Sequence, residues 1–259
     1  MGEGDSVTVS SKKFPISEVF GPVAQGEGIL MGQRSMFLRF GACDGVDGRG
    51  GLCLFCDSMY AADSHNKEQW DYLTVEEIVT KLRELAPYCH FVTITGGNPV
   101  LYDLADLVEQ LKDNGYTIAV ETQATIYKPW LIGCDVVTLS PKPPSSGFTC
   151  DLNKLDWVMA QFAFEQLNYN NGGGVQVVFK VVVNPNNDED YRFASMLAAR
   201  YFAHKFYMLT LTKPDDTVET LLKRYRQLEK RVMEDTVVGD VHVGMQLHAM
   251  VHGADKRGI

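Results

Sequence analysis

The fold is decided by residues 90–122, HFVTITGGNPVLYDLADLVEQLKDNGYTIAVET. Residues 90–95 form a β-rich run that ends at two glycines, and residues 103–114 carry apolar side chains at helical spacing. Gly115 follows this helix, where the absence of a Cβ allows the left-handed conformation that ends many helices. Residues 116–121 form the next β-rich run. The succession of strand, helix and strand predicts a parallel βαβ unit.

The same alternation continues on both sides of this unit. We expect further strands at 34–41, 135–140, 175–183, 206–212 and 240–247, and further helices at 152–167, 187–203 and 217–235. Thr74 and the two glutamates after Val75 predict the start of another helix, which Pro87 ends. No internal repeat and no long linker interrupts the sequence. We therefore predict one α/β domain over residues 14–259, preceded by a disordered N-terminal tail, residues 1–13.

The composition excludes several classes of protein. The 259 residues include 24 basic and 33 acidic side chains, which gives a net charge of −9. The sequence contains no long Lys/Arg cluster. We therefore expect no broad nucleic-acid face. No stretch approaches the ~20 apolar residues that a membrane helix needs, so we expect no membrane partner. The six scattered cysteines do not fit a disulfide scaffold, and they indicate a reducing, cytoplasmic location.

Polar residues follow several predicted strands at the point where each strand ends. The groups are Thr95-Gly96-Gly97, Glu121-Thr122-Gln123, Ser140-Pro141-Lys142 and Gln246-Leu247-His248. The carboxyl ends of parallel strands meet at one edge of the sheet, where α/β proteins bind their ligands. We expect these four groups to share one rim.

Three cysteines, Cys43, Cys53 and Cys56, have the spacing C-x9-C-x2-C around a glycine-rich loop. Three local thiolates suit a [4Fe–4S] cluster that leaves one iron open to another ligand. A zinc site would need a fourth ligand, for which the adjacent pair Cys89-His90 is the nearest candidate. The remaining cysteines, Cys89, Cys134 and Cys150, lie among apolar neighbours and are interpreted as ordinary thiols.

With these motifs the chain resembles the radical S-adenosylmethionine superfamily and, within it, the 7-carboxy-7-deazaguanine synthases. The resemblance runs from about Ser17 to the C-terminus and rests on the cysteines together with Gln25-Gly-Glu-Gly, Phe37-Leu-Arg-Phe-Gly, Cys56-Asp57-Ser58, Thr95-Gly-Gly-Asn-Pro, Glu121-Thr-Gln, Ser140-Pro-Lys-Pro and Gln246-Leu-His. It implies the modified partial (βα) barrel of the superfamily.

The resemblance also implies two cofactors. Cys43, Cys53 and Cys56 match the ligands of the [4Fe–4S] cluster, whose open iron is chelated by S-adenosyl-L-methionine. The positions that match cofactor-binding residues are Phe55, Asp57, Gly96, Gly97, Glu121, Ser140, Pro141 and Lys142. The cluster receives its electron from a donor such as flavodoxin or ferredoxin.

The implied activity is that of a carbon–nitrogen lyase in queuosine and 7-deazapurine biosynthesis. It converts 6-carboxy-5,6,7,8-tetrahydropterin to 7-carboxy-7-deazaguanine with loss of ammonia. The positions that match substrate contacts are Ala24, Gln25, Gly26, Glu27, Arg39, Thr95 and His248, and Ser58 matches a Mg²⁺ ligand. Members of the family are typically homodimers.

The sequence departs from the family at two motifs, since GGEP is GGNP here and ETNGT is ETQAT. Asn98 therefore cannot supply the carboxylate of the common pattern. Two other readings stay open: a radical S-adenosylmethionine enzyme with a different substrate, and a non-catalytic zinc-binding module that uses the same cysteines.

Overall fold

The computed structural model describes residues 12–45, 51–168, 174–253 and 258. Most of the predicted tail, residues 1–11, and the middle of the cysteine loop, residues 46–50, lie outside this part. Within it, all strands belong to one sheet in the order β3-β1-β2-β4-β5-β6-β7-β8-β9. Strands β2 and β4 to β9 run parallel, whereas β1 is antiparallel to both β2 and β3. The predicted α/β partial barrel is confirmed.

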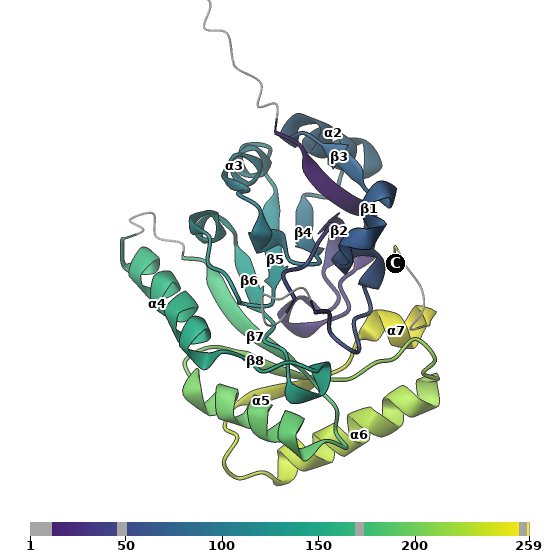
Figure 1. The fold of residues 1–259 in the computed structure, drawn as a ribbon, viewed down its shortest axis with the longest axis vertical. Helices are drawn as coiled ribbons and strands as arrows, with labels where there is room; N and C mark the ends of the chain where they lie inside the picture. The colour runs from purple at the N-terminus through teal and green to yellow at the C-terminus, as the bar shows by residue number, and fades with distance from the viewer. Residues whose placement is uncertain (1–11, 46–50, 169–173, 254–257, 259) are drawn as a thin grey trace, which may run out of the picture.

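The strands are short, and most alternate with helices. The strands are β1 (Phe14–Ala24), β2 (Arg34–Phe40), β3 (Asp71–Leu73), β4 (Phe91–Gly96), β5 (Thr117–Thr122), β6 (Val136–Leu139), β7 (Gln176–Val183), β8 (Phe206–Thr210) and β9 (Val241–Gly244). The helices are α1 (Met59–Ala62), α2 (Val75–Leu85), α3 (Ala105–Asp113), α4 (Leu152–Asn168), α5 (Asp188–Arg200), α6 (Val218–Glu234) and α7 (Leu247–His252). Helices α2 to α6 lie along the outer side of the curved sheet (Figure 1).

Local sequence explains where the second helix begins. The backbone N–H of Glu77 donates to Thr74 Oγ1 at 3.3 Å, and the N–H of Thr74 donates to Glu77 Oε2 at 2.7 Å. This reciprocal pair satisfies two donors that the first turn of a helix leaves free. Ile78 and Leu82 then lie on the buried face of α2. The helix predicted from Thr74 is confirmed.

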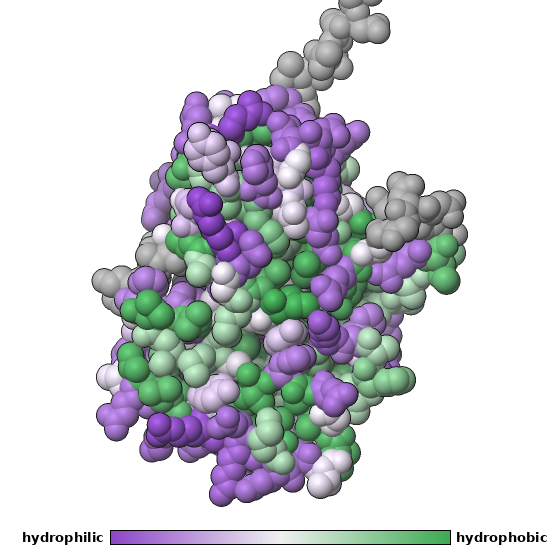
Figure 2. Space-filling model, turned by 180° about the vertical axis from the view of Figure 1, so that it is seen from behind, coloured by the Kyte–Doolittle hydropathy of each residue, from purple (hydrophilic) through white to green (hydrophobic). Residues whose placement is uncertain are grey.

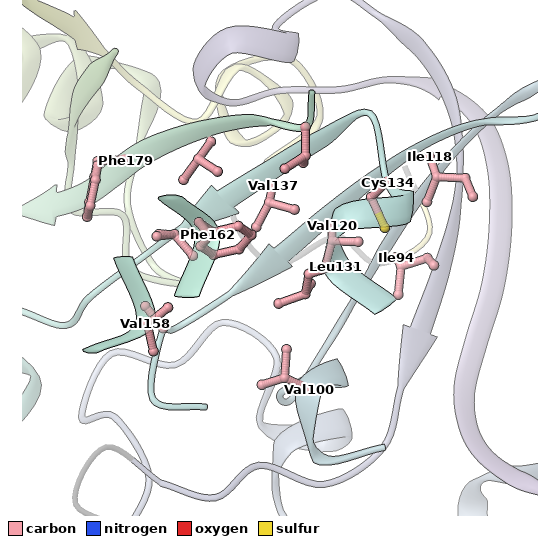
Figure 3. Close-up of a cluster of buried hydrophobic side chains, with 14 of the residues drawn as sticks. Ile94, Val100, Ile118, Val120, Leu131, Cys134, Val137, Val158, Phe162 and Phe179 are labelled. Atoms are coloured by element: carbon pink, nitrogen blue, oxygen red, sulfur yellow. The ribbon is translucent and has the colours of Figure 1, made fainter. Parts of the chain in front are cut away.

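The core fills the space between the parallel strands and the helices outside them. Figure 3 shows strand residues Ile94, Val120 and Val137 pointing toward the same layer as Val158 and Phe162 of α4. All five side chains are essentially buried. Apolar burial of this kind stabilises each side chain by roughly 1.5–3 kcal/mol, and it holds the strand ends in register for the site they carry.

The predicted strand over 240–247 was wrong at its end. Strand β9 stops at Gly244, and α7 begins at Leu247, so His248 lies on a helix. The backbone N–H of Leu247 donates to the carbonyl of Gly26 at 2.9 Å, and this tertiary contact turns the chain back across β1. The composition near His248, rich in Val and Gly, concealed that turn.

The surface mixes polar and apolar side chains. Figure 2 shows the face behind that of Figure 1, where apolar residues are interspersed with hydrophilic ones. Phe164 and Leu167 of α4 are among the exposed apolar side chains. In the described part of the chain, none of the helices combines the length and the hydropathy that crossing a membrane requires.

Candidate active site

A cavity of about 570 Å³ opens at the carboxyl ends of the parallel strands. It is lined by residues from all four predicted rim groups, which follow β4, β5, β6 and β9. Of the site residues predicted from the sequence, all except Pro141 line it. Pro141 is buried beside the rim. Residues from the two ends of the chain and from its middle therefore share one chamber.

Two glycines bring the first cysteine to this chamber. A Cβ on Gly97 would lie 2.0 Å from the carbonyl oxygen of Ala42, and one on Gly96 would lie 2.3 Å from that of Phe40. Only glycine permits this approach of the end of β4 to the segment after β2. The backbone N–H of Gly97 donates to the carbonyl of Phe40 at 3.1 Å. Cys43 is thereby held beside the glycine pair.

The three cysteines Cys43, Cys53 and Cys56 are free thiols that line the same cavity. Burial raises the pKa of the Cys43 and Cys56 thiols to about 11, so both are protonated at neutral pH. No three His, Cys, Asp or Glu side chains among the described residues are already gathered closely enough to hold a metal ion. Assembly of a cluster would therefore bring the thiols together and displace their protons.

This donor set fits a cluster held by three cysteines better than a closed zinc site. Cys89 lies at the opposite end of β4 from Gly96, and its thiol faces the backbone carbonyls of Arg34 and Phe91, at 3.9 and 3.7 Å. Neither Cys89 nor His90 lines the cavity. The pair that the sequence offered as the fourth zinc ligand is therefore absent from the described lining.

A buried cation, Lys180 of β7, lies between two carboxylates of the cavity. Its Nζ donates to Glu27 Oε2 at 2.5 Å and to Glu121 Oε1 at 3.0 Å. Burial by itself raises the pKa of Glu27, but the charges of Lys180 and His248, together with the hydrogen bonds from Lys180 and Gln246, outweigh it and lower that pKa to about 2. Burial likewise opposes the charge of Lys180, yet Glu121 and Glu27 together raise its pKa above the ordinary value. The carboxylate of Glu27 and the ammonium of Lys180 are thus both ionised at neutral pH.

Arg39 of β2 is a second cation of the cavity, and only 16% of its side chain is exposed. Its Nε donates to Glu18 Oε1 at 2.7 Å, and its NH1 donates to Ser58 Oγ at 3.1 Å. Burial lowers the pKa of Arg39, but the surrounding Tyr60, Glu18 and Asp57 outweigh that effect and raise it. The guanidinium is therefore fixed in place before any ligand arrives.

An amide joins the two parts of this polar lining. Gln246 donates from Nε2 to Glu27 Oε1 at 2.6 Å and to Asp57 Oδ2 at 3.2 Å. Asp57 Oδ1 also accepts the hydroxyl of Ser58 at 2.7 Å. Hydrogen bonds thus run from Lys180 through Glu27 and Gln246 to the segment that follows Cys56.

The sequence did not single out Lys180, Gln246 or Tyr60 as site residues. Lys180 is the lone charged residue in the apolar strand VVFKVVV. A charge within an otherwise apolar strand was the signal that could have identified it as a site residue. Gln246 belonged to a predicted rim group without a role of its own. Tyr60 donates its hydroxyl to Glu18 Oε1 at 2.5 Å, and nothing in its sequence context distinguishes it.

Comparisons with known proteins agree with this geometry. The pattern of the radical SAM superfamily matches residues 49–139. The chain is 36% identical over 258 residues to 7-carboxy-7-deazaguanine synthase of Bacillus subtilis (strain 168), covering 96% of this chain and 100% of that one. It is 35% identical over 256 residues to the enzyme of the same name from Bacillus cereus, covering 95% and 99%.

A solved structure shares the fold. The crystal structure of QueE from Escherichia coli superposes with a TM-score of 0.62 at 19% identity, covering 95% of this chain and 100% of that one. The likeness in fold includes nearly the whole chain. The sequence identity to the two Bacillus enzymes over nearly the whole chain leads to one conclusion: the chain belongs to the 7-carboxy-7-deazaguanine synthase family of the radical S-adenosylmethionine superfamily.

Proposed function

We propose that this protein converts 6-carboxy-5,6,7,8-tetrahydropterin to 7-carboxy-7-deazaguanine, with loss of ammonia, as a carbon–nitrogen lyase on the route to queuosine and other 7-deazapurines. Its cofactors are a [4Fe–4S] cluster and S-adenosyl-L-methionine. One observation carries the proposal: the three cysteines, the glycine pair and the polar residues matched to the pterin all line a single cavity.

Residues of the cavity wall would hold the cofactors. Cys43, Cys53 and Cys56 would bind the cluster, and Phe55, Asp57 and Glu121 would line the S-adenosylmethionine site with the backbone of the glycine pair. Lys142 donates from Nζ to Ser140 Oγ at 3.3 Å, which directs a cation toward the cavity at the end of β6. When bound, the cluster and S-adenosylmethionine supply one-electron chemistry.

The substrate carries a carboxylate and a guanine-like edge, and the cavity offers a match to each. The guanidinium of Arg39 suits the carboxylate, because its planar fork can donate two parallel hydrogen bonds. Glu27 is ionised beside Lys180, so its oxygens only accept hydrogen bonds, as the N–H groups of a pterin edge require. Gln25 offers an amide with both a donor and an acceptor. Ala24, Gly26, Thr95 and His248 complete the proposed substrate contacts.

We propose further that Ser58 binds Mg²⁺ with the substrate carboxylate. A hydroxyl and the neighbouring Asp57 carboxylate are hard oxygen donors of the kind that Mg²⁺ prefers. S58A is expected to lose the stimulation of turnover by Mg²⁺. The exposed S64A serves as the matched control. Equal stimulation in both variants would reject the metal site.

The remaining proposals concern organisation and partners. Residues 14–259 would act as one domain, which the single sheet supports. The protein would work in the cytoplasm, where its six free thiols stay reduced. A flavodoxin or a ferredoxin would supply the electron, and two copies would form a homodimer.

Anaerobic reconstitution with iron and sulfide tests the function. We expect iron–sulfur absorption in the wild type and in C150A, and none in C56A. Reduced protein with S-adenosylmethionine and the carboxytetrahydropterin should then yield carboxydeazaguanine, detected by mass spectrometry. Cofactor cleavage without this product would indicate a different substrate. One bound zinc with no cluster would reject enzymatic function.

A further inference from the structure

The carboxylate of Asp44, next to the first cysteine, is held by three side chains. Its Oδ1 accepts from Asn98 Nδ2 at 2.8 Å and from Gln123 Nε2 at 2.5 Å, and its Oδ2 accepts from Thr125 Oγ1 at 2.6 Å. The donors come from the ends of β4 and β5. Asp44 is not part of the cavity lining. Any effect it has on a ligand must therefore pass through its neighbour, Cys43.

Asn98 holds both residues that flank Cys43. Its backbone N–H donates to the carbonyl of Ala42 at 2.8 Å, while its side chain donates to Asp44. Asn98 has no exposed surface, and its Oδ1 accepts the hydroxyl of Thr122 at 2.8 Å. The orientation of the Asn98 amide is therefore set from both ends, with its NH₂ group facing Asp44.

We propose that Asp44 is a positioning residue that fixes Cys43 for the cluster, and that its carboxylate requires an uncharged hydrogen-bond donor at position 98. This proposal rests on the proposed cluster site. A carboxylate at position 98 would face Asp44 at hydrogen-bond distance without a proton between them, and both would be poorly hydrated. The departure at position 98, asparagine in place of glutamate, then accompanies the acid at position 44, to which the amides of Asn98 and Gln123 both donate.

Isosteric exchange of the acid and the amide tests the pairing. D44N removes the negative charge of Asp44. N98D adds a second negative charge beside it, and D44N/N98D restores one acid and one amide. D63N, at a half-exposed position that caps the short helical turn over residues 64–69, is the matched control. For each reconstituted chain we would measure iron content, the rate of iron loss to a chelator, and the electron paramagnetic resonance spectrum of the reduced cluster with and without S-adenosylmethionine. The melting temperature of the apo chain reports on the fold.

We expect D44N and N98D each to weaken cluster retention roughly 10-fold, the scale seen when residues that orient metal ligands are changed. The exchanged pair should recover part of this loss, because it restores a hydrogen bond between positions 44 and 98 but not the one that Gln123 donates to the same oxygen. D63N should match the wild type. The spectrum should change in the single variants even where the apo melting temperature does not.

Three results would overturn the inference. D44N could retain its cluster and spectrum as the wild type does, or D44N/N98D could be as impaired as N98D alone. Alternatively, the apo melting temperature could fall while the spectrum of the remaining cluster stays unchanged, which would make Asp44 a purely structural residue. Failure of the wild type to take up any cluster would reject the proposed function as well, so the two failures are distinguishable.

Discussion

Lys180 and Glu27 form an ion pair between residues 153 positions apart, with Nζ 2.5 Å from Oε2. Lys180 lies on β7, the third strand from one edge of the sheet, and Glu27 follows β1, the second strand from the other edge. Their side chains are only 6% and 12% exposed. The pair therefore links two distant strands across the cavity and keeps both charges away from solvent.

Replacing this lysine should destabilise the chain strongly. K180M removes the cation but keeps much of the side-chain volume, so Glu27 and Glu121 remain as carboxylates with little solvent access and no cationic partner. Removing one member of a buried pair costs about 3–5 kcal/mol. Urea unfolding of the apo chain under anaerobic conditions measures the free energy of unfolding.

K112M is the matched control for this experiment. Lys112 pairs with Asp135 at the surface, where both side chains are more than a third exposed, so its loss should cost less than about 1 kcal/mol. Equal losses in the two variants would show that the Lys180 pair contributes no more than a surface pair.

The same site should make stability depend on pH under acidic conditions. The pKa of Glu27 is lowered from 4.5 to about 2, because the charges of Lys180 and His248 and the hydrogen bonds from Lys180 and Gln246 together outweigh the effect of burial. Because the pKa of Glu27 is lower in the folded chain than in the unfolded chain, its ionised form stabilises the fold. This stabilisation is complete above pH 4.5 and is lost as the pH falls toward 2. The wild type should therefore lose roughly 3 kcal/mol relative to E27Q between pH 4.5 and 2. Parallel urea-unfolding curves across that range would contradict the assignment.

Arg39 should affect substrate binding more than cofactor binding. R39K keeps the positive charge but loses the planar fork that reaches both Glu18 and Ser58. Losing a charge-assisted hydrogen bond costs about 1.5–3 kcal/mol, which corresponds to a roughly 10- to 100-fold rise in KM for the carboxytetrahydropterin. Steady-state kinetics and titration with S-adenosylmethionine separate the two effects. The exposed R34K on the same strand is the control. A weaker S-adenosylmethionine affinity with unchanged KM would contradict the role.

Asp190 should support the cysteine loop from outside the cavity. This fully buried carboxylate accepts from the backbone N–H and the hydroxyl of Ser145, at 2.9 and 2.5 Å, and from the backbone N–H of Asn184 at 3.0 Å. The next carbonyl, that of Ser146, accepts the N–H of Leu54 at 3.0 Å. The turn after β6 thus connects α5 to the residue that follows Cys53.

D190A should lower the free energy of unfolding by roughly 3 kcal/mol, because several donors lose their acceptor. It should also reduce the iron content after reconstitution. D188N, at an exposed position on the same helix, should change stability by less than about 1 kcal/mol. A D190A chain that matches D188N in both measurements would exclude this connection.

The sequence predicted the parallel part of the fold well, because its signals are local. The capping pair Thr74–Glu77 and the glycine after α3 mark helix ends whatever the rest of the chain does. Strand β1 gave no comparable pattern, since it contains Pro15 and Pro22 and its pairing with β2 is interrupted by register shifts. Antiparallel pairing at this edge depends on contacts that periodicity does not encode.

The candidate site likewise contains residues that local sequence motifs predict and residues that they do not. The cysteines and the glycine pair carry recognisable spacing, so their shared position followed from motifs. Lys180 has no local signal, because its two partners come from other strands and the strand around it is apolar. Asn98 looked like a missing charge in the sequence. Its acceptor, Asp44, lies 54 residues away and was visible only in three dimensions.

The hydrogen bond between Asp44 and Asn98 also limits how this site can evolve. If the two positions are coupled as proposed, a change from Asn98 to glutamate is harmful while Asp44 is present and tolerable once that acid has been lost. The order of mutations then matters, and the two positions should covary across homologous enzymes. Lineages with a glutamate after the glycine pair should carry a non-acidic residue after the first cysteine, and lineages with asparagine should retain the acid.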